Sequence, residues 1–291
     1  MMIRLLLALA LAVTFARAEL PMDVCFKGDA KFQALVGRLK EHAETLRKTP
    51  IGERTAYIGR WLVGTPYKGY TLEIHDSIEA PSCNLYGLDC WTFFETSLAF
   101  ARMAEEPAEN WTPQTLLKYI EADRYWGGKC TGDYLSRLHY LEDWLSDNDS
   151  RGLVRDMTRS LGGVGVPNSA TEMTVNWKSY RYMRKNPQLR GGISKLETRL
   201  RSRPLVMIPT SKVAGIESQL QSGDVIGIVS RDGRAYGTSH VGLALRKDGV
   251  LHFMHASAPR NYGKVVIDSR LSEYLARFKN HAGILVARPL K

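Results

Sequence analysis

Residues 88–95 read Leu-Asp-Cys-Trp-Thr-Phe-Phe-Glu and begin a segment that we predict to be a helix over residues 90–103. The apolar side chains expected on its inner side recur at helical spacing: Phe93, Phe94, Leu98 and Ala101. Cys90 stands at the start of this helix, where free backbone N–H groups and the helix dipole stabilise negative charge. Because the thiolate is the nucleophilic form of cysteine, this position suits a catalytic residue. A buried or disulfide-bonded Cys90 is the structural alternative.

Two histidines lie on consecutive predicted strands in the C-terminal third of the chain. Asp248-Gly249 is a preferred two-residue hairpin turn, and pairing outward from it sets Gly242 opposite His255. Since side chains alternate along a strand, His240 shares a face with His255 and lies diagonal to it, within reach. His252 falls on the opposite face and is excluded from the pair.

The small residues Gly242 and Ala244 on this face let a helix approach, so we expect the Cys90 helix to dock there. The prediction is a thiolate nucleophile at Cys90, a base at His240 and an orienting group at His255. Zinc bound by the same three side chains is an alternative, because Cys and His are zinc ligands. No Cys-x-x-Cys or His-Glu-x-x-His motif is present, and we expect no metal and no cofactor.

The wider pattern predicts an α+β fold, with helices first and an antiparallel sheet after them. Helical patterns cover residues 30–49, 53–63, 90–103 and 134–145, and another helix is expected to start at Pro113 with Thr112 as its N-cap. A turn is predicted at residues 64–69, and the secondary structure of residues 172–203 is ambiguous. Strands are predicted at residues 71–75, 224–229, 240–245, 251–257, 264–267 and 283–287.

Composition sets the class of protein. The chain has 291 residues, of which 44% are hydrophobic, and this excludes a mainly disordered chain. Residues 1–18 have the form of a signal peptide: a basic start, an apolar run from Leu5 to Phe15, and Ala16-Arg17-Ala18 before the expected mature start at Glu19. That run is the longest apolar one and is too short to span a bilayer. We therefore predict a periplasmic or secreted protein without a transmembrane segment.

The positive charge is concentrated in one stretch. The formal net charge is +10, and the segment from Lys178 to Arg203 holds nine basic residues against Glu197 alone. One interpretation is a solvated basic surface. The other is a surface that contacts an anionic envelope polymer, which for an exported protein is a better candidate than DNA. Tyr180 and Tyr182 are interleaved, but no nucleic-acid motif accompanies them, so no nucleic-acid partner is expected.

These motifs, taken in order, resemble the NlpC-type cell-wall hydrolases. The resemblance rests on Asp89-Cys90 opening a helix, on residues 239–242 (Ser-His-Val-Gly), on residues 255–257 (His-Ala-Ser) and on the turn at residues 64–67 (Gly-Thr-Pro-Tyr). More narrowly, residues 88–95, 136–140, 143–144, 223–224 and 255–257 resemble the N-acetylmuramoyl-L-alanine amidase-like branch. The similarity runs from about residue 30 to the C-terminus. Trp91 and Phe94 depart from it, because valine is expected at both.

The resemblance implies a papain-like core, with the catalytic cysteine at a helix N-terminus packed on an antiparallel sheet. It also implies cleavage of the amide bond between N-acetylmuramic acid and L-Ala in muropeptides. A γ-D-glutamyl-diamino acid endopeptidase uses the same chemistry and remains an alternative, as does a non-catalytic envelope-binding module. We expect a single catalytic domain over residues 19–291. A large, mostly helical insertion at about 105–210 is expected to narrow the substrate range.

Two further residues are candidates for substrate binding. The resemblance places Tyr67 beside the catalytic helix, where its hydroxyl is expected to point into the cleft. Arg137 is expected to hold a carboxylate of the stem peptide through paired hydrogen bonds. The structural alternatives are a packed tyrosine and an arginine bridged to Glu95 or Asp143.

The remaining cysteines are Cys25, Cys83 and Cys130, which allow at most one disulfide if Cys90 stays free. The sequence does not select the pair. A bond between Cys83 and Cys130 would brace the loop before the Cys90 helix.

Overall fold

A single antiparallel sheet organises the computed structural model, which describes residues 20–290. Within that range eight strands pair in the order β4-β5-β10-β6-β7-β8-β9, and β3 pairs with β10 beside β5. The strands are β3 (Val154–Asp156), β4 (Val164–Val166), β5 (Leu205–Pro209), β6 (Val225–Asp232), β7 (Ala235–Lys247), β8 (Val250–Ala256), β9 (Val265–Arg270) and β10 (His281–Pro289). A small parallel pair, β1 (Phe26–Lys27) and β2 (Cys83–Asn84), lies apart.

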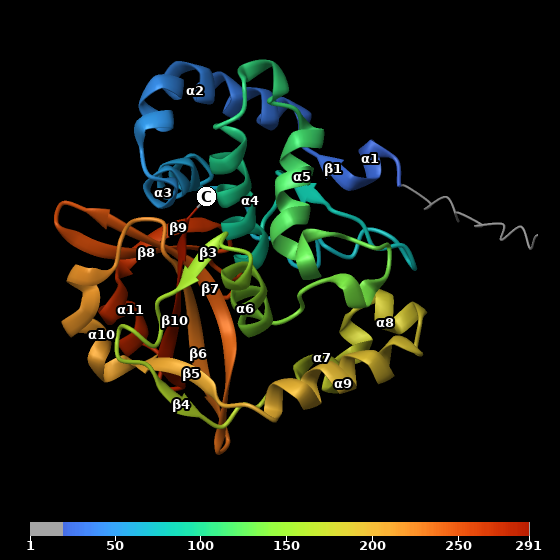
Figure 1. Cartoon of the computed structure of the whole chain (residues 1–291), viewed down its shortest axis with the longest axis vertical. Coiled ribbons are helices and arrows are strands. Elements are labelled where there is room, and N and C mark those ends of the chain that lie inside the picture. The colour runs from blue at the N-terminus through green and yellow to red at the C-terminus, as the bar shows by residue number, and fades with distance from the viewer. Residues whose placement is uncertain (1–19, 291) are drawn as a thin grey trace, which may run out of the picture.

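Helices cover both faces of this sheet (Figure 1). They are α1 (Met22–Cys25), α2 (Asp29–Lys48), α3 (Ile51–Trp61), α4 (Cys90–Met103), α5 (Pro113–Arg124), α6 (Leu141–Ser150), α7 (Glu172–Val175), α8 (Arg181–Lys185), α9 (Leu189–Arg201), α10 (Thr210–Ile216) and α11 (Leu271–Ala276). On one face α3 and α4 pack on β7, and on the other α10 and α11 pack on β10. Alternate strand residues point into the two layers, as Leu243 and Ala244 do.

The central helix, α4, has the predicted bounds. Every residue from Thr92 to Met103 is buried, and burial of each large apolar side chain stabilises the fold by about 1.5–3 kcal/mol. Buried ion pairs join α4 to α5: Glu95 with Arg124 and Arg102 with Asp123. At the start of α5, Thr112 accepts a hydrogen bond from the backbone N–H of Thr115, as the predicted N-cap requires. Together these contacts fix the position of the helix that carries Cys90.

The hairpin between β7 and β8 has the predicted register. Leu245 lies opposite His252 and Leu243 opposite Met254. Asp248 and Gly249 have φ of 51° and 79°, which are the values of a type I′ turn. At Gly242 a Cβ atom would lie 2.6 Å from the Met254 carbonyl oxygen and 2.8 Å from the Cβ of His255, so a side chain does not fit there.

Two of the predicted elements are wrong. Residues 71–75 form turns and bends rather than a strand, because the Glu73 N–H bonds locally to the Tyr70 carbonyl. The predicted helix over residues 134–145 is interrupted after a short 3-10 turn (Tyr134–Ser136) and resumes as α6. Arg137 is extended, because it bridges the backbone of Tyr125 in β fashion.

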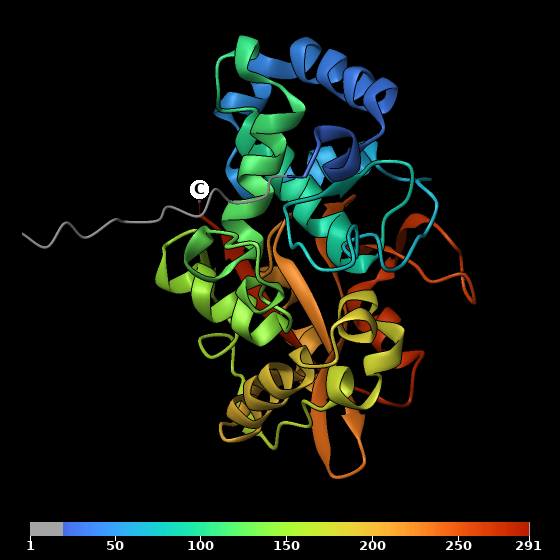
Figure 2. The same cartoon turned by 90° about the vertical axis from the view of Figure 1, so that its right-hand side faces the viewer.

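The segment 105–210 is only partly helical. It supplies α5 to α9, but it also supplies β3, β4 and β5, which join the main sheet. The ambiguous residues 172–203 form α7, α8 and α9, which lie beside the far end of the β6–β7 hairpin in Figure 2. The segment therefore contributes both to the sheet and to a helical layer at its end.

Cys83 and Cys130, one of the pairs that the sequence left open, are not bonded, since no disulfide joins any of the cysteines in the described residues. The Cys83 sulfur lies 3.9 Å from the Thr96 hydroxyl on α4, whereas the Cys130 thiol donates to the Glu79 carbonyl. The two thiols therefore contact different neighbours and are not bonded to each other.

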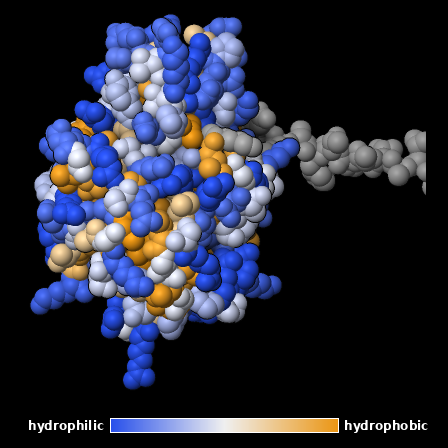
Figure 3. Space-filling model, turned by 60° about the vertical axis from the view of Figure 1, so that its left-hand side comes forward, coloured by the Kyte–Doolittle hydropathy of each residue, from blue (hydrophilic) through white to orange (hydrophobic). Residues whose placement is uncertain are grey.

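The predicted signal peptide and mature start at Glu19 lie outside the described residues. From residue 20 to residue 290, no helix combines the length and the apolar character needed to cross a membrane. The face drawn in Figure 3 is largely hydrophilic, with apolar patches across its middle and lower parts.

Candidate active site

Cys90 occupies the first turn of α4, and a reciprocal cap holds that turn. The Asp89 carboxylate accepts from the Thr92 backbone N–H at 2.8 Å, and the Thr92 hydroxyl accepts from the Asp89 N–H at 2.9 Å. The capping box fixes the backbone on both sides of Cys90, whose side chain is half-buried. The sulfur is thus presented from a rigid helix end.

The two predicted histidines meet across the β7–β8 pair. His240 Nε2 and His255 Nδ1 lie 2.7 Å apart, and the rings are perpendicular. A β-bulge precedes His240: Ile228 faces His240 and Val229 faces Thr238, which leaves Ser239 unpaired. Such bulges turn the next side chain relative to a regular strand.

A backbone N–H group of the strand that carries His240 lies near the Cys90 sulfur. The N–H of Val241, the residue after His240, is within hydrogen-bonding reach of the Cys90 sulfur, as are the N–H groups of Trp91 and Cys90 itself. Helix α4 packs directly on β7 and β8. Cys90 and His240 line one cavity, and His240 contacts His255. The predicted docking of the helix on Gly242 and Ala244 is wrong, because Phe93 of α4 clusters with Leu243 and Met254, on the other face of the two strands.

Burial and hydrogen bonding act on the Cys90 thiol in opposite directions. Burial, reinforced by the Asp89 carboxylate, raises the pKa of the Cys90 thiol to about 12, although the three N–H groups act in the opposite direction. That the helix N-terminus stabilises a thiolate stays a prediction, and burial acts against it. Loss of hydration outweighs the helix dipole here.

His240 is also neutral at rest. Burial, followed by the charges of His255, His281 and Arg260, lowers the pKa of His240 well below its usual value. A neutral thiol beside a neutral imidazole can transfer its proton as the sulfur attacks a substrate. The lowered pKa leaves the His240 ring able to accept a proton at neutral pH.

We expect this charge state to appear in alkylation kinetics. Iodoacetamide should inactivate the protein slowly at neutral pH, and the rate should still be rising above about pH 9, because only the thiolate reacts. Free cysteine, with a pKa of about 8.5, serves as the reference whose rate levels off first. Intact-mass measurement of the modified protein gives the rate at each pH. A rate that is already maximal at pH 7 would indicate a preformed thiolate instead.

A cavity of about 580 Å³ opens at Cys90 and His240. This volume is in the range of about 300–1,000 Å³ found for small-molecule sites. The 105–210 segment supplies the lining residues within 134–141 and 172–180, and the others lie within 67–73, 89–91 and 238–241 and at Pro259. The segment thus restricts what can reach the sulfur.

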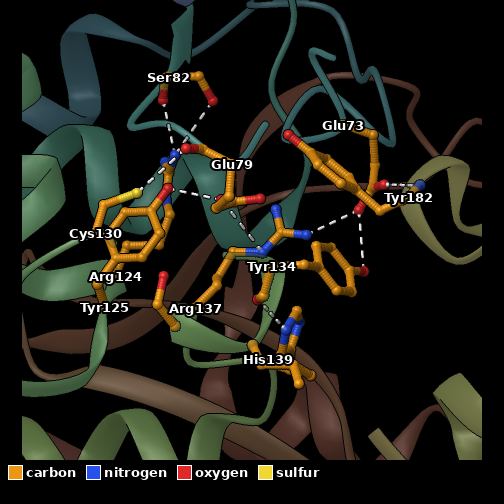
Figure 4. Close-up of polar contacts among 12 residues, drawn as sticks. Glu73, Glu79, Ser82, Arg124, Tyr125, Cys130, Tyr134, Arg137, His139 and Tyr182 are labelled. Atoms are coloured by element: carbon orange, nitrogen blue, oxygen red, sulfur yellow. Dashed lines mark hydrogen bonds and ion pairs between the residues drawn. The ribbon is translucent and has the colours of Figure 1, made fainter. Parts of the chain in front are cut away.

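A buried polar network supports that wall (Figure 4). Arg137 lies between two glutamates, with Nη2 2.8 Å from Glu73 Oε1 and Nε 3.7 Å from Glu79 Oε1. Tyr134 donates to Glu73, and Tyr125 donates to Glu79. The network ties the loop around Glu73 and Glu79 to the segment that carries Arg137.

Both predicted substrate-binding residues lie at the cavity, but they differ in burial and in the groups beside them. Arg137 is 4% exposed and is bridged to carboxylates, but these are not Glu95 and Asp143, whose partners are other arginines: Arg124 for Glu95, and Arg199 and Arg203 for Asp143. Tyr67 is half-buried, and burial together with Cys90 and Asp89 raises the pKa of its hydroxyl. Its phenol thus lies near the sulfur.

His252 and Asp268 lie close to the histidine pair in the sheet. His252 is on the opposite face from the histidine pair, as predicted, and its Nδ1 lies 2.8 Å from the Asp268 carbonyl oxygen. The Asp268 carboxylate, which sequence reasoning did not select, lies 3.4 Å from His255 Nε2. Among residues 20–290 no cluster of three or more His, Cys, Asp or Glu side chains is arranged to hold a metal ion.

Comparison with known proteins now gives the family. The family model for AmiA-like, N-acetylmuramoyl-L-alanine amidase-like proteins matches residues 57–284, which include every site residue described above. The chain belongs to this amidase-like family. The match starts before Tyr67 and ends within β10, so it covers the helix, the cavity wall and the histidine strands of this family member. No curated protein matches the chain.

Solved structures agree with the family. A crystal structure of an N-acetylmuramoyl-L-alanine amidase from Bacteroides uniformis is 26% identical, with a TM-score of 0.72 over 83% of this chain and 99% of that one. A protein from Bacteroides fragilis described as a putative xylanase is 31% identical, with a TM-score of 0.69 over 79% and 98%. A protein of Legionella pneumophila, at 22% identity and a TM-score of 0.64 over 90% and 97%, shares the fold.

Proposed function

We propose that the chain is an exported cysteine amidase that cleaves the amide bond between N-acetylmuramic acid and L-Ala in muropeptides. The observation that carries the proposal is that Cys90, His240 and Val241, whose N–H reaches the Cys90 sulfur, line one cavity, with His255 2.7 Å behind His240. Family membership supports the substrate class. The papain-like, NlpC-type core belongs to the same proposal, as does export after cleavage before Glu19.

The proposed reaction has two halves. The Cys90 sulfur attacks the lactyl carbonyl carbon while its proton passes to His240, and a tetrahedral intermediate forms. The carbon–nitrogen bond breaks, the L-Ala nitrogen takes the proton from His240, and the muramyl group remains as a thioester. Water, deprotonated by His240, then attacks the thioester, and the sulfur recovers its proton as the carboxylate leaves. The N–H groups within reach of the sulfur are the candidates to stabilise the negative charge of the intermediate.

Two alternative functions share parts of this site. A γ-D-glutamyl-diamino acid endopeptidase needs the same cysteine and histidines, and only the shape of the cavity separates it from an amidase. A non-catalytic envelope-binding module has no use for a buried Cys–His–His arrangement.

A glycosidase, the activity implied by the description of the Bacteroides fragilis protein, needs two carboxyl groups flanking the bond that is cut. The acidic residues of this cavity are already engaged. Glu73 pairs with Arg137, Asp89 caps α4, and Glu172 accepts from Tyr180.

Mass spectrometry of defined muropeptides tests the proposal. An amidase releases the free stem peptide and the intact sugar, whereas the endopeptidase shortens the stem and leaves L-Ala attached to muramic acid. The digestion is run with the wild type and with Cys90→Ala, each with and without EDTA. Loss of activity in EDTA with recovery on adding zinc would support the zinc alternative.

Kinetics and melting separate the two possible roles of Tyr67 and Arg137. A substrate contact predicts a raised KM with little change in melting temperature. For Arg137→Ala we expect mainly lost stability, of about 3–5 kcal/mol, because Glu73 and Glu79 would be left as buried charges without their partner. For Tyr67→Phe we expect a raised KM and an unchanged melting temperature.

Arg124→Ala is the matched control, since Arg124 is equally buried and pairs with Glu95 but does not line the cavity. If Arg137→Ala raises KM well beyond the control at equal folded fraction, Arg137 contacts substrate as first predicted. If Tyr67→Phe has wild-type kinetics, the Tyr67 hydroxyl does not contact the substrate.

The basic stretch from Lys178 to Arg203 is proposed to contact anionic envelope polymers. Several of its charges are already balanced, as Arg181 is by Asp76. Six exposed basic side chains of the stretch form no ion pair with an acidic residue within residues 20–290: Lys178, Arg184, Lys185, Arg190, Lys195 and Arg201. Retention of the protein on isolated cell walls should fall as salt rises, because screening weakens such contacts.

A further inference from the structure

We propose that Asp268 is a positioning residue that acts through His255 to select the tautomer of His240 that can serve as a base. The inference rests on the proposed cysteine mechanism and goes beyond it, because it assigns the protons on both histidine rings. It comes from three side chains on three neighbouring strands.

The three residues form a diagonal row across the sheet. His240 is on β7, His255 is on β8 opposite Val266, and Asp268 is on β9 two residues after Val266, on the same side of the sheet as His255. The β8–β9 register shifts between His252 and Met254, so a bulge lies at Asp268. His255 is 2% exposed and Asp268 is 8% exposed, so the row is shielded from water.

The partners of Asp268 decide which of its oxygens faces His255. Oδ1 accepts from the Ser269 backbone N–H at 2.6 Å and from the Arg277 guanidinium, both of which can only donate. Oδ2 is thereby left for His255 Nε2, at 3.4 Å. Although burial alone would raise the pKa of Asp268, hydrogen bonds from His255, Ser269 and Arg277 hold it below its usual range. The group facing His255 is therefore an ionised acceptor.

The Asp268 carboxylate determines which ring nitrogen of His255 carries the hydrogen, and His255 then determines the same for His240. A carboxylate oxygen requires a hydrogen on His255 Nε2, and a neutral imidazole then has a bare Nδ1. That bare Nδ1 is 2.7 Å from His240 Nε2, which must carry the hydrogen of the bond. His240 consequently has a bare Nδ1, the nitrogen that remains to take the proton from Cys90. The row sets this tautomer before substrate arrives.

Replacement of Asp268 by asparagine should move the hydrogen to the other ring nitrogen in both His255 and His240. Because Arg277 and Ser269 keep the amide oxygen at the Oδ1 position, the amide NH₂ would face His255 Nε2 and donate to it. His255 would then donate from Nδ1 to His240 Nε2, and His240 Nδ1 would carry a hydrogen that blocks it as a base. We expect a kcat at least about 10²-fold below wild type, since a wrong histidine tautomer costs about 10⁴-fold in a serine protease triad.

Asp268→Ala provides the discriminating comparison. It leaves His255 Nε2 without a fixed partner, so both tautomers are populated and we expect a loss of only about ten-fold in kcat. A merely structural role for Asp268 predicts the opposite order, with the smaller alanine worse than the nearly isosteric asparagine. Asp224→Asn is the matched control, because Asp224 is a buried aspartate paired with Arg288 that lines neither the cavity nor the histidine row.

Nitrogen NMR of histidine-labelled Cys90→Ala protein gives a readout that does not depend on activity. The expected result is a protonated Nε2 on His240, and a protonated Nδ1 once Asp268→Asn is added. Equal kcat in wild type and Asp268→Asn, or the same His240 tautomer in both, would overturn the inference while leaving the mechanism intact. Retained activity in Cys90→Ala would instead remove the proposed function itself.

Discussion

Cys90→Ala should reduce muropeptide hydrolysis to background while the protein stays folded. The side chain is small, so its loss disturbs packing little, but no other group can form the thioester. Removing the nucleophile of a hydrolytic triad costs about 10⁶-fold in kcat, and we expect a loss of comparable size here. Product release, followed by mass spectrometry over long incubations, measures it, and circular dichroism and the melting temperature report the fold.

Cys90→Ser and Cys83→Ala are the companion variants. Serine keeps the shape but has a far more basic alkoxide, so it should be as inactive as alanine. Cys83 is a buried thiol against Thr96, outside the cavity, and its removal should affect the melting temperature but not kcat. Activity above background in Cys90→Ala would remove the cysteine mechanism altogether.

The second large effect is expected at His240. His240→Ala should lower kcat by about 10³-fold or more, because the thiol, with a pKa raised to about 12, then has no base to take its proton. Neutral pH leaves almost no thiolate in that variant. A rise in residual activity with pH toward 10 is the signature, because hydroxide then generates the thiolate that the histidine no longer helps to form.

His255 and His252 give a graded comparison on one strand. His255→Ala should be milder than His240→Ala, and His255→Asn or His255→Gln should recover part of the rate by restoring an acceptor for His240. His252→Ala is the matched control, since it removes the same side chain three residues away on the opposite face. If His252→Ala were the damaging change, the assignment of the histidine pair would have to be abandoned.

The parts of the site that the sequence predicted depend on local signals. The cap at Asp89 and the apolar spacing after it were sufficient to place Cys90 at the start of α4. The Asp248-Gly249 turn was sufficient for the β7–β8 register, because a two-residue loop leaves one pairing, and alternation then puts His240 and His255 on one face.

The remainder depends on contacts between distant segments. Glu73 and Arg137 are 64 residues apart, and neither shows in its own surroundings that they form one side of a cavity. The charge state of Cys90 could not be predicted because burial, which dominates it, is a property of the packed structure. Asp268 was missed because a long loop precedes β9, and no short turn sets its register against β8.

The raised pKa of the Cys90 thiol bears on how the sulfur reacts with oxidants. Oxidants such as peroxide attack thiolates rather than thiols, and a sulfenic acid on the nucleophile ends catalysis. A sulfur that stays protonated until a substrate and His240 act on it together offers oxidants little to react with between turnovers. The burial that raises the pKa of the thiol thereby protects the residue on which the proposed chemistry depends.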